Sequence, residues 1–132
     1  MNLLAKEADF ALVEQAKNAI TAVYRADNVY HTVGAALRCK NGRVYTGVNC
    51  DGIHGACAEF VAMGAAITAG EREFDLIVAV TGRHNGDRIL PPCGNCRQML
   101  YEYCPDIGVL IHDGRELLRL PILTLLPYPY HE

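Results

Sequence analysis

The sequence predicts an α/β fold in which helices cover a mixed five-stranded sheet. Helical and strand-like segments alternate along the chain, and a hairpin signal joins two of the strand-like segments, so the sheet is expected to be mixed. A length of 132 residues, without an internal repeat or a linker, is typical of one compact domain. We therefore expect a single domain over residues 1–132.

The first element is an amphipathic helix from about residue 3 to 25, because its apolar side chains recur at helical spacing. Two strand-like segments follow, Thr32–Arg38 and Arg43–Val48. Between them stands Asn41-Gly42, the residue pair most typical of a tight hairpin. A polar loop from Asn49 to Gly55 leads to the next element.

The second half begins with an apolar segment of small residues, Cys57–Ala69, which predicts a helix buried on most sides. Phe74–Thr81 is a continuous apolar run and is expected to be a central strand. After a loop, a helix is expected from Cys93 to about Tyr103, ended by Pro105. A strand, a short edge strand and a final turn are expected at Ile107–His112, Glu116–Arg119 and Pro121–Leu126.

The composition excludes several classes of protein. Apolar residues make up 51% of the chain and charged residues 20%, which is incompatible with intrinsic disorder. The net charge is −3 and the basic residues are scattered, which argues against nucleic-acid or membrane partners. No apolar run reaches the ~18 residues of a membrane span, and the chain does not begin like a secretion signal. We expect a cytoplasmic protein.

Three of the six cysteines have a spacing that indicates a metal site. Cys93 and Cys96 are three residues apart at the start of a predicted helix, so both sulfurs point to one side. Cys57 stands at the equivalent place on the other helix. If the two helix starts meet, three thiolates converge, and soft thiolates in a tetrahedral arrangement select zinc. Three protein ligands leave a fourth position for water, which is the catalytic pattern.

Glu59 is the only ionisable residue between Cys57 and Gly70. From its place two residues beyond a ligand, its carboxylate could reach a water bound to zinc. A half-buried carboxylate has a raised pKa and can carry a proton in both directions. A hydroxide together with a proton shuttle adds water across a C=N bond and expels ammonia, so the pattern indicates hydrolytic deamination.

Three stretches together resemble the cytidine deaminase family: Cys57-Ala58-Glu59, Pro92–Gln98 and Leu125-Leu126-Pro127. The resemblance implies a three-layer cytidine deaminase-like fold and zinc as the cofactor. It implies that Cys57, Cys93 and Cys96 hold the zinc and that Glu59 is the proton shuttle, as in zinc deaminases with three cysteines.

The resemblance also implies a free cytosine nucleoside as substrate and a homotetramer as the assembly. The residues expected to contact the substrate are Asn49, Asp51, Ala58, His31, Arg88 and Tyr130. Asp51 stands where the family has a glutamate that holds the ribose, and His31 where it commonly has a phenylalanine. Tyr130 matches an aromatic residue that caps the base, often from a neighbouring subunit.

Several alternatives remain open. Thr46–Asn49 and His54 are similar to the blasticidin-S deaminase branch of the family, so a modified nucleoside such as blasticidin S is a second substrate. Cys93 and Cys96 could form a redox dithiol. Cys50 could be a fourth ligand of a structural zinc, in a non-catalytic zinc-binding module. Editing of RNA or DNA is disfavoured by the acidic balance.

The charge of the expected metal site needs compensation, because zinc with three thiolates carries a charge of −1. Relatives place an arginine beside the ligands at positions that hold Phe60 and Asn95 here. We expect the helix N-termini and Arg97 to offset this charge.

Overall fold

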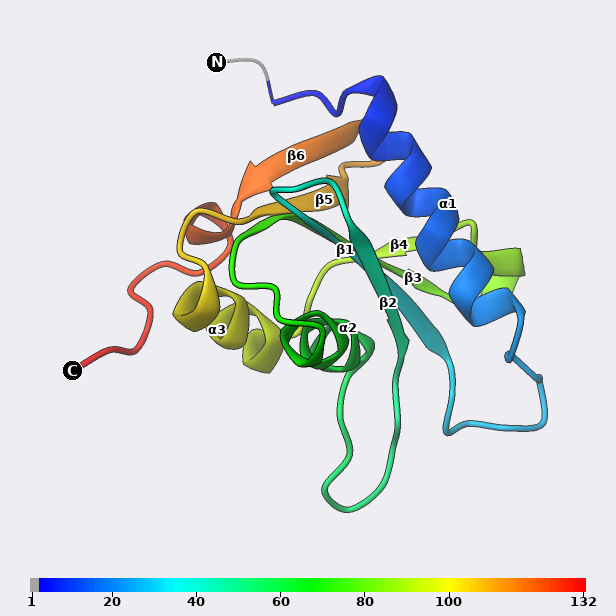
Figure 1. Cartoon of the computed structure of the whole chain (residues 1–132). Helices are drawn as coiled ribbons and strands as arrows, with labels where there is room; N and C mark the ends of the chain where they lie inside the picture. The colour runs from blue at the N-terminus through cyan, green and yellow to red at the C-terminus, as the bar shows by residue number, and fades with distance from the viewer. Residues whose placement is uncertain (1–2) are drawn as a thin grey trace.

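The computed structural model describes residues 3–132, which form three layers (Figure 1). The helices are α1 (Glu7–Thr21), α2 (Ala58–Thr68) and α3 (Gly94–Tyr103). The strands are β1 (Val33–Cys39), β2 (Val44–Val48), β3 (Phe74–Thr81), β4 (Ile89–Leu90), β5 (Gly108–His112) and β6 (Leu117–Pro121). Two short 3-10 helices are η1 (Arg83–Gly86) and η2 (Ile122–Thr124).

The sheet is mixed, with the order β2-β1-β3-β5-β6 and with β4 paired to β3. β3 and β5 run parallel, whereas the other pairs are antiparallel. The five predicted strands are confirmed. β4 is an addition in the segment predicted as a loop, where its two residues pair with Ala79 and Val80. Two residues are too few to leave a periodic pattern in the sequence.

Each face of the sheet carries its own core. Ala36 of β1 packs in the core that α1 covers, whereas its neighbours Ala35 and Leu37 pack in the core of α2 and α3. This division follows from the alternation of side chains along a strand. α1 therefore lies on one face of the sheet, and α2 and α3 lie together on the other (Figure 1).

Two glycines allow the helices to approach the β1–β2 hairpin from opposite faces. A Cβ at Gly34 would lie 2.5 Å from the carbonyl oxygen of Ala16 in α1. A Cβ at Gly47 would lie 2.5 Å from the backbone nitrogen of Ala62 in α2. A side chain at either position would push its helix away. Gly47 thus sets the depth of α2, the helix that follows Cys57.

The first helix is shorter than the expected span of residues 3 to 25. Residues before Glu7 are extended instead, because they pair with the edge of β6: the Arg119 N–H donates to the Leu3 carbonyl (2.7 Å) and the Ala5 N–H to the Leu117 carbonyl (2.9 Å). This pairing covers an otherwise open strand edge. At the other end, α1 stops at Thr21, whose hydroxyl donates back to the Lys17 carbonyl (2.9 Å).

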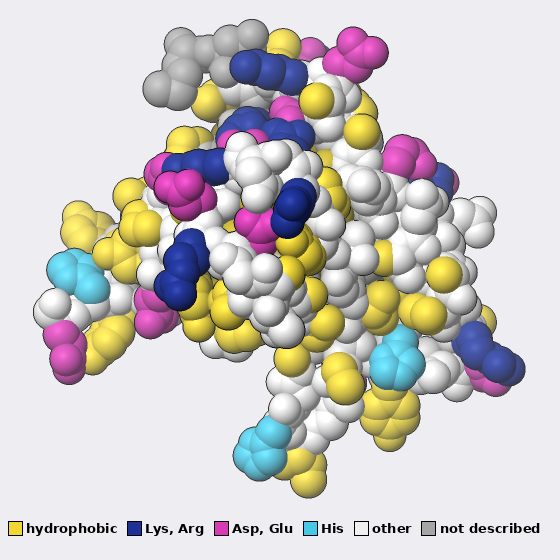
Figure 2. Space-filling view, in the orientation of Figure 1, with side chains coloured by type: hydrophobic (Ala, Val, Ile, Leu, Met, Phe, Trp, Pro, Cys, Tyr) yellow, Lys and Arg dark blue, Asp and Glu magenta, His cyan; other side chains and the backbone are white. Residues whose placement is uncertain are grey.

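The surface carries charges of both signs. On the face drawn in Figure 2, Lys and Arg side chains are interspersed with Asp and Glu side chains. Among residues 3–132, no helix combines the length and the apolar character that crossing a membrane requires.

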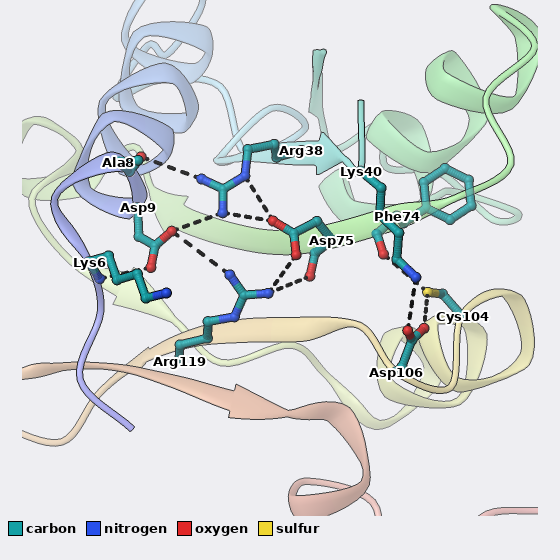
Figure 3. A network of polar contacts seen from close by, with 10 residues as sticks. All are labelled: Lys6, Ala8, Asp9, Arg38, Lys40, Phe74, Asp75, Cys104, Asp106 and Arg119. Atoms are coloured by element: carbon teal, nitrogen blue, oxygen red, sulfur yellow. Dashed lines mark hydrogen bonds and ion pairs between the residues drawn. The ribbon is translucent and has the colours of Figure 1, made fainter. Parts of the chain in front are cut away.

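Four charged side chains fasten α1 to the sheet (Figure 3). Arg38 of β1 donates through Nη2 to Asp9 of α1 (2.9 Å) and to Asp75 of β3 (2.8 Å). Arg119 of β6 donates through Nη2 to the other oxygen of Asp75 (2.6 Å). Asp9 is almost wholly buried and also accepts the N–H of Lys6 (2.9 Å), which caps the start of α1. The network therefore joins α1, β1, β3 and β6 through two carboxylates, of which Asp9 is buried.

Candidate active site

The sulfurs of Cys57, Cys93 and Cys96 converge where α2 and α3 begin. Cys57 occupies the N-cap position of α2, Cys93 occupies that of α3, and Cys96 lies in the first turn of α3. The three Sγ atoms lie within 4.8 Å of one another, and those of Cys57 and Cys93 are 3.8 Å apart. Sulfurs bound to one tetrahedral zinc at ~2.3 Å are about 3.8 Å apart. The donor set therefore fits a zinc ion.

The surroundings of the three thiols shift their pKa values in different directions. Burial raises the pKa of the Cys96 thiol, and the negative charges of Glu59 and Cys57 raise it further. Burial also raises the pKa of Cys57. Burial disfavours the thiolate of Cys93 too, but hydrogen bonds, foremost from the backbone N–H of Cys96, lower its pKa. A bound divalent cation would stabilise all three thiolates.

A cavity of about 180 Å³ opens beside the sulfurs. Its apolar wall is formed by Val33, Ala58, Leu90 and Pro91. Its polar lining consists of Asn49, Asp51, Glu59, Cys57 and Cys93. Cys96 is buried, whereas Cys93 is exposed, so the sulfur group is covered on one side and accessible on the other. Among residues 3–132, the lining contains no basic side chain.

Glu59 projects from the first turn of α2 into this cavity, two residues beyond Cys57. Glu59 is only 6% exposed. Burial raises the pKa of its carboxyl group above the ordinary value. A carboxyl group with a raised pKa holds a proton more readily than an exposed one, which suits a general acid and base.

Asn49 is held at the end of β2 by its own hydrogen bonds. Its Oδ1 accepts the backbone N–H groups of Thr32 (2.7 Å) and Val33 (2.9 Å). Its Nδ2 donates to the Thr32 hydroxyl (3.2 Å) and to Oδ1 of Asp51 (2.9 Å). The amide is thus engaged on both sides, and it fixes the carboxylate of Asp51 at the cavity wall.

The structure brings together some of the predicted substrate contacts. Asn49, Asp51 and Ala58 line the cavity. His31 is not among the lining residues; it donates through Nδ1 to the Asn49 carbonyl (3.0 Å). Arg88 and Tyr130 are not among the lining residues of this chain.

Two further residues line the cavity, and one cysteine lies apart from the sulfur group. Leu90 and Pro91 line the cavity although sequence reasoning did not single them out; the two prolines just before Cys93 were the signal that could have found them. Cys50 does not join the sulfur group, which within residues 3–132 consists of Cys57, Cys93 and Cys96. The alternative of Cys50 as a fourth ligand therefore has no support from this geometry.

Comparison with known proteins identifies the class. Residues 6–111 match the family model of the cytidine and deoxycytidylate deaminase zinc-binding region, so the chain belongs to this family. Zinc is thus the metal of the matched region, and the three converging cysteines are the group that could hold it.

Individual relatives agree with this assignment. The chain is 38% identical over 132 residues to a blasticidin-S deaminase of Bacillus cereus, with 94% of this chain and 93% of that protein covered. It is 41% identical over 100 residues to a cytidine deaminase of Halalkalibacterium halodurans, with 72% and 74% covered. These matches confirm the family that the sequence motifs predicted.

Solved structures confirm the predicted fold. The cytidine deaminase of Burkholderia pseudomallei superposes with a TM-score of 0.74 at 31% identity, covering 92% of this chain and 98% of that one. The cytidine deaminase of Mycobacterium tuberculosis superposes with a TM-score of 0.75 at 27% identity, covering 97% and 100%.

Proposed function

We propose that this protein is a zinc-dependent hydrolase that converts the cytosine ring of a free nucleoside to the uracil form and releases ammonia. The observation that carries the proposal is the cavity in which three converging sulfurs meet one buried carboxylate. Cys57, Cys93 and Cys96 would hold the zinc. When bound, zinc would supply Lewis-acid activation of a water molecule.

Glu59 would move the protons of the reaction. It accepts a proton from the water that attacks C4 and delivers it to ring N3 as the C4–O bond forms. It then transfers the second proton to the amine as the C4–N bond breaks and ammonia leaves. The low exposure of Glu59 supports this role, because a buried carboxyl group does not lose its proton to bulk water.

The remaining cavity residues would position the nucleoside. Asp51 would accept a hydrogen bond from a sugar hydroxyl, since Asn49 holds its carboxylate at the wall through one oxygen. Asn49 would lie against the sugar, and His31 would support Asn49 through the hydrogen bond to its carbonyl. Ala58 lies in the first turn of α2, whose N–H groups have no partner within the helix and could meet the ring carbonyl.

Arg88 and Tyr130 remain predictions. Arg88 is exposed beside β4, two residues before the lining residue Leu90. Tyr130 is 71% exposed, so in the proposed homotetramer its ring would be available to the cavity of a neighbouring copy. We further propose a cytoplasmic location, in keeping with a free nucleoside as substrate.

Blasticidin S is the second candidate substrate. The near full-length match to a blasticidin-S deaminase favours it. The acidic side chains of Asp51 and Glu59 in the cavity lining favour a neutral nucleoside over a substrate that carries a carboxylate.

Ammonia release separates these possibilities. The zinc-loaded protein is assayed with cytosine, cytidine, deoxycytidine, their 5-substituted forms and blasticidin S. We expect release from cytidine and deoxycytidine. Release from blasticidin S alone would favour the second candidate. Stoichiometric zinc without ammonia from any of these compounds would favour a non-catalytic zinc-binding module.

A further inference from the structure

The turn that leads into Cys93 has few backbone hydrogen-bond donors. It contains Pro91 and Pro92, and neither residue has a backbone N–H to donate. The turn can therefore be fixed only by its side chains and through its carbonyl groups. Pro91 also lines the cavity, and Cys93 is exposed, so a shift of this turn would move both a wall of the cavity and one sulfur.

Arg97 supplies a hydrogen bond to this turn. Its Nε donates to the carbonyl of Pro92 (2.7 Å), which belongs to the peptide directly before Cys93. Its Nη1 donates to the carbonyl of Leu125 (2.9 Å), just after η2. The planar guanidinium thus bridges two backbone segments that are far apart in the sequence.

The Leu125 end of this bridge is firmly anchored. Ile122 in η2 is fully buried, and its N–H donates to the Ile107 carbonyl (3.0 Å). The next side chain of α3 adds a second fastening, because Gln98 donates to the Tyr130 carbonyl (2.8 Å) and accepts the Tyr130 N–H (3.2 Å). The C-terminal segment is therefore held along the N-terminal half of α3. Through Arg97, this segment also fixes the position of the turn before Cys93.

We propose that Arg97 is a positioning residue of the metal site, which fixes the Cys93 sulfur by tying the Pro92 carbonyl to the Leu125 carbonyl. This role differs from offsetting the charge of the thiolates, because it depends on the forked geometry of the guanidinium and not on its charge alone. It rests on the proposed zinc site and is independent of which nucleoside is the substrate.

Two substitutions distinguish the two roles. Arg97→Lys keeps the positive charge, but a single ammonium cannot reproduce the fork that reaches both carbonyls. Arg97→Gln removes the charge as well. Loss of a group that orients a metal ligand typically lowers metal affinity about 10–100-fold. Arg115→Lys, in the exposed turn between β5 and β6, is the matched control.

The test measures zinc affinity by competition with a chelator and records the thiolate–metal absorption of the Co²⁺-substituted protein. We expect both Arg97 variants to lose about 10–100-fold in zinc affinity and to show an altered Co²⁺ spectrum, with Arg115→Lys unchanged. Retention of affinity and spectrum by Arg97→Lys, alone or together with Arg97→Gln, would overturn the proposal.

Urea unfolding of the metal-free variants is the second readout. A loss of stability as large as the loss of zinc-binding free energy would assign Arg97 to the fold as a whole and would also overturn the proposal. Zinc binding by the parent protein is measured in the same series, so a failure of the zinc site itself is seen separately.

Discussion

Replacing Arg38 by methionine tests whether the buried charge network fastens α1 to the sheet (Figure 3). The substitution leaves the Asp9 carboxylate, whose side chain is 2% exposed, without its closest cation. Removing one member of a buried ion pair costs about 3–5 kcal/mol. Asp9 keeps the N–H of Lys6, and the side chain of Arg38 is itself 18% exposed, so we expect a loss below this range, of about 2–3 kcal/mol.

Urea unfolding followed by circular dichroism measures this loss. With an unfolding entropy of about 2.1 cal/mol/K per residue, a loss of 2–3 kcal/mol lowers the melting temperature by about 7–11 °C for a chain of this length. Arg72→Met, at an exposed position between α2 and β3, is the control. The double variant Asp9→Asn with Arg38→Met should cost less than the sum of the two single changes. A loss within about 0.5 kcal/mol for Arg38→Met would refute the reasoning.

Burial opposes the charge of Asp75, but hydrogen bonds from its two arginine partners lower its pKa, so it stabilises the fold above its unfolded pKa of about 4 and this contribution is lost as the pH falls below that value. Asp75→Asn should therefore make the free energy of unfolding less dependent on pH in acid. A free energy of unfolding that falls as steeply with decreasing pH as that of the parent protein would contradict this. Gly47→Ala should lower the free energy of unfolding in urea by about 1–3 kcal/mol, because its Cβ would meet the backbone of Ala62. Gly64→Ala should raise it by about 0.5–1 kcal/mol, because a Cβ at this helix position would meet no other atom. Equal effects of the two alanines would be inconsistent with close helix–sheet contact at Gly47. Asp51→Asn should raise KM for cytidine about 10–100-fold with little change in kcat, since it weakens one charged hydrogen bond; an unchanged KM would remove Asp51 from the sugar site.

Strong local signals predicted most of the fold. The strand Phe74–Thr81 has the bounds that its apolar run predicted, and Asn41-Gly42 marks the hairpin between β1 and β2. The sequence could not show that residues 3–6 are extended. Their apolar pattern fits the helix that follows, and only the open edge of β6, more than 100 residues away, decides the outcome.

The convergence of Cys57, Cys93 and Cys96 was predictable for a related reason. Helix starts at Cys57 and Cys93 place sulfurs by local geometry, so the motif carries most of the information. The surroundings of the site depend on contacts between distant segments. Asn49 is engaged by residues 16 and 17 positions away, and Arg97 reaches Leu125 at a separation of 28. No periodicity or spacing in the sequence encodes such pairs.

Glu59→Gln, with zinc content and ammonia release measured on the same sample, tests the central claim most directly. The substitution keeps the shape of the side chain and removes its ability to exchange protons. We expect one zinc per chain and a rate of ammonia release from cytidine that is lower by about 10²–10⁴. A variant that keeps its zinc and releases ammonia at the rate of the parent protein would contradict the account.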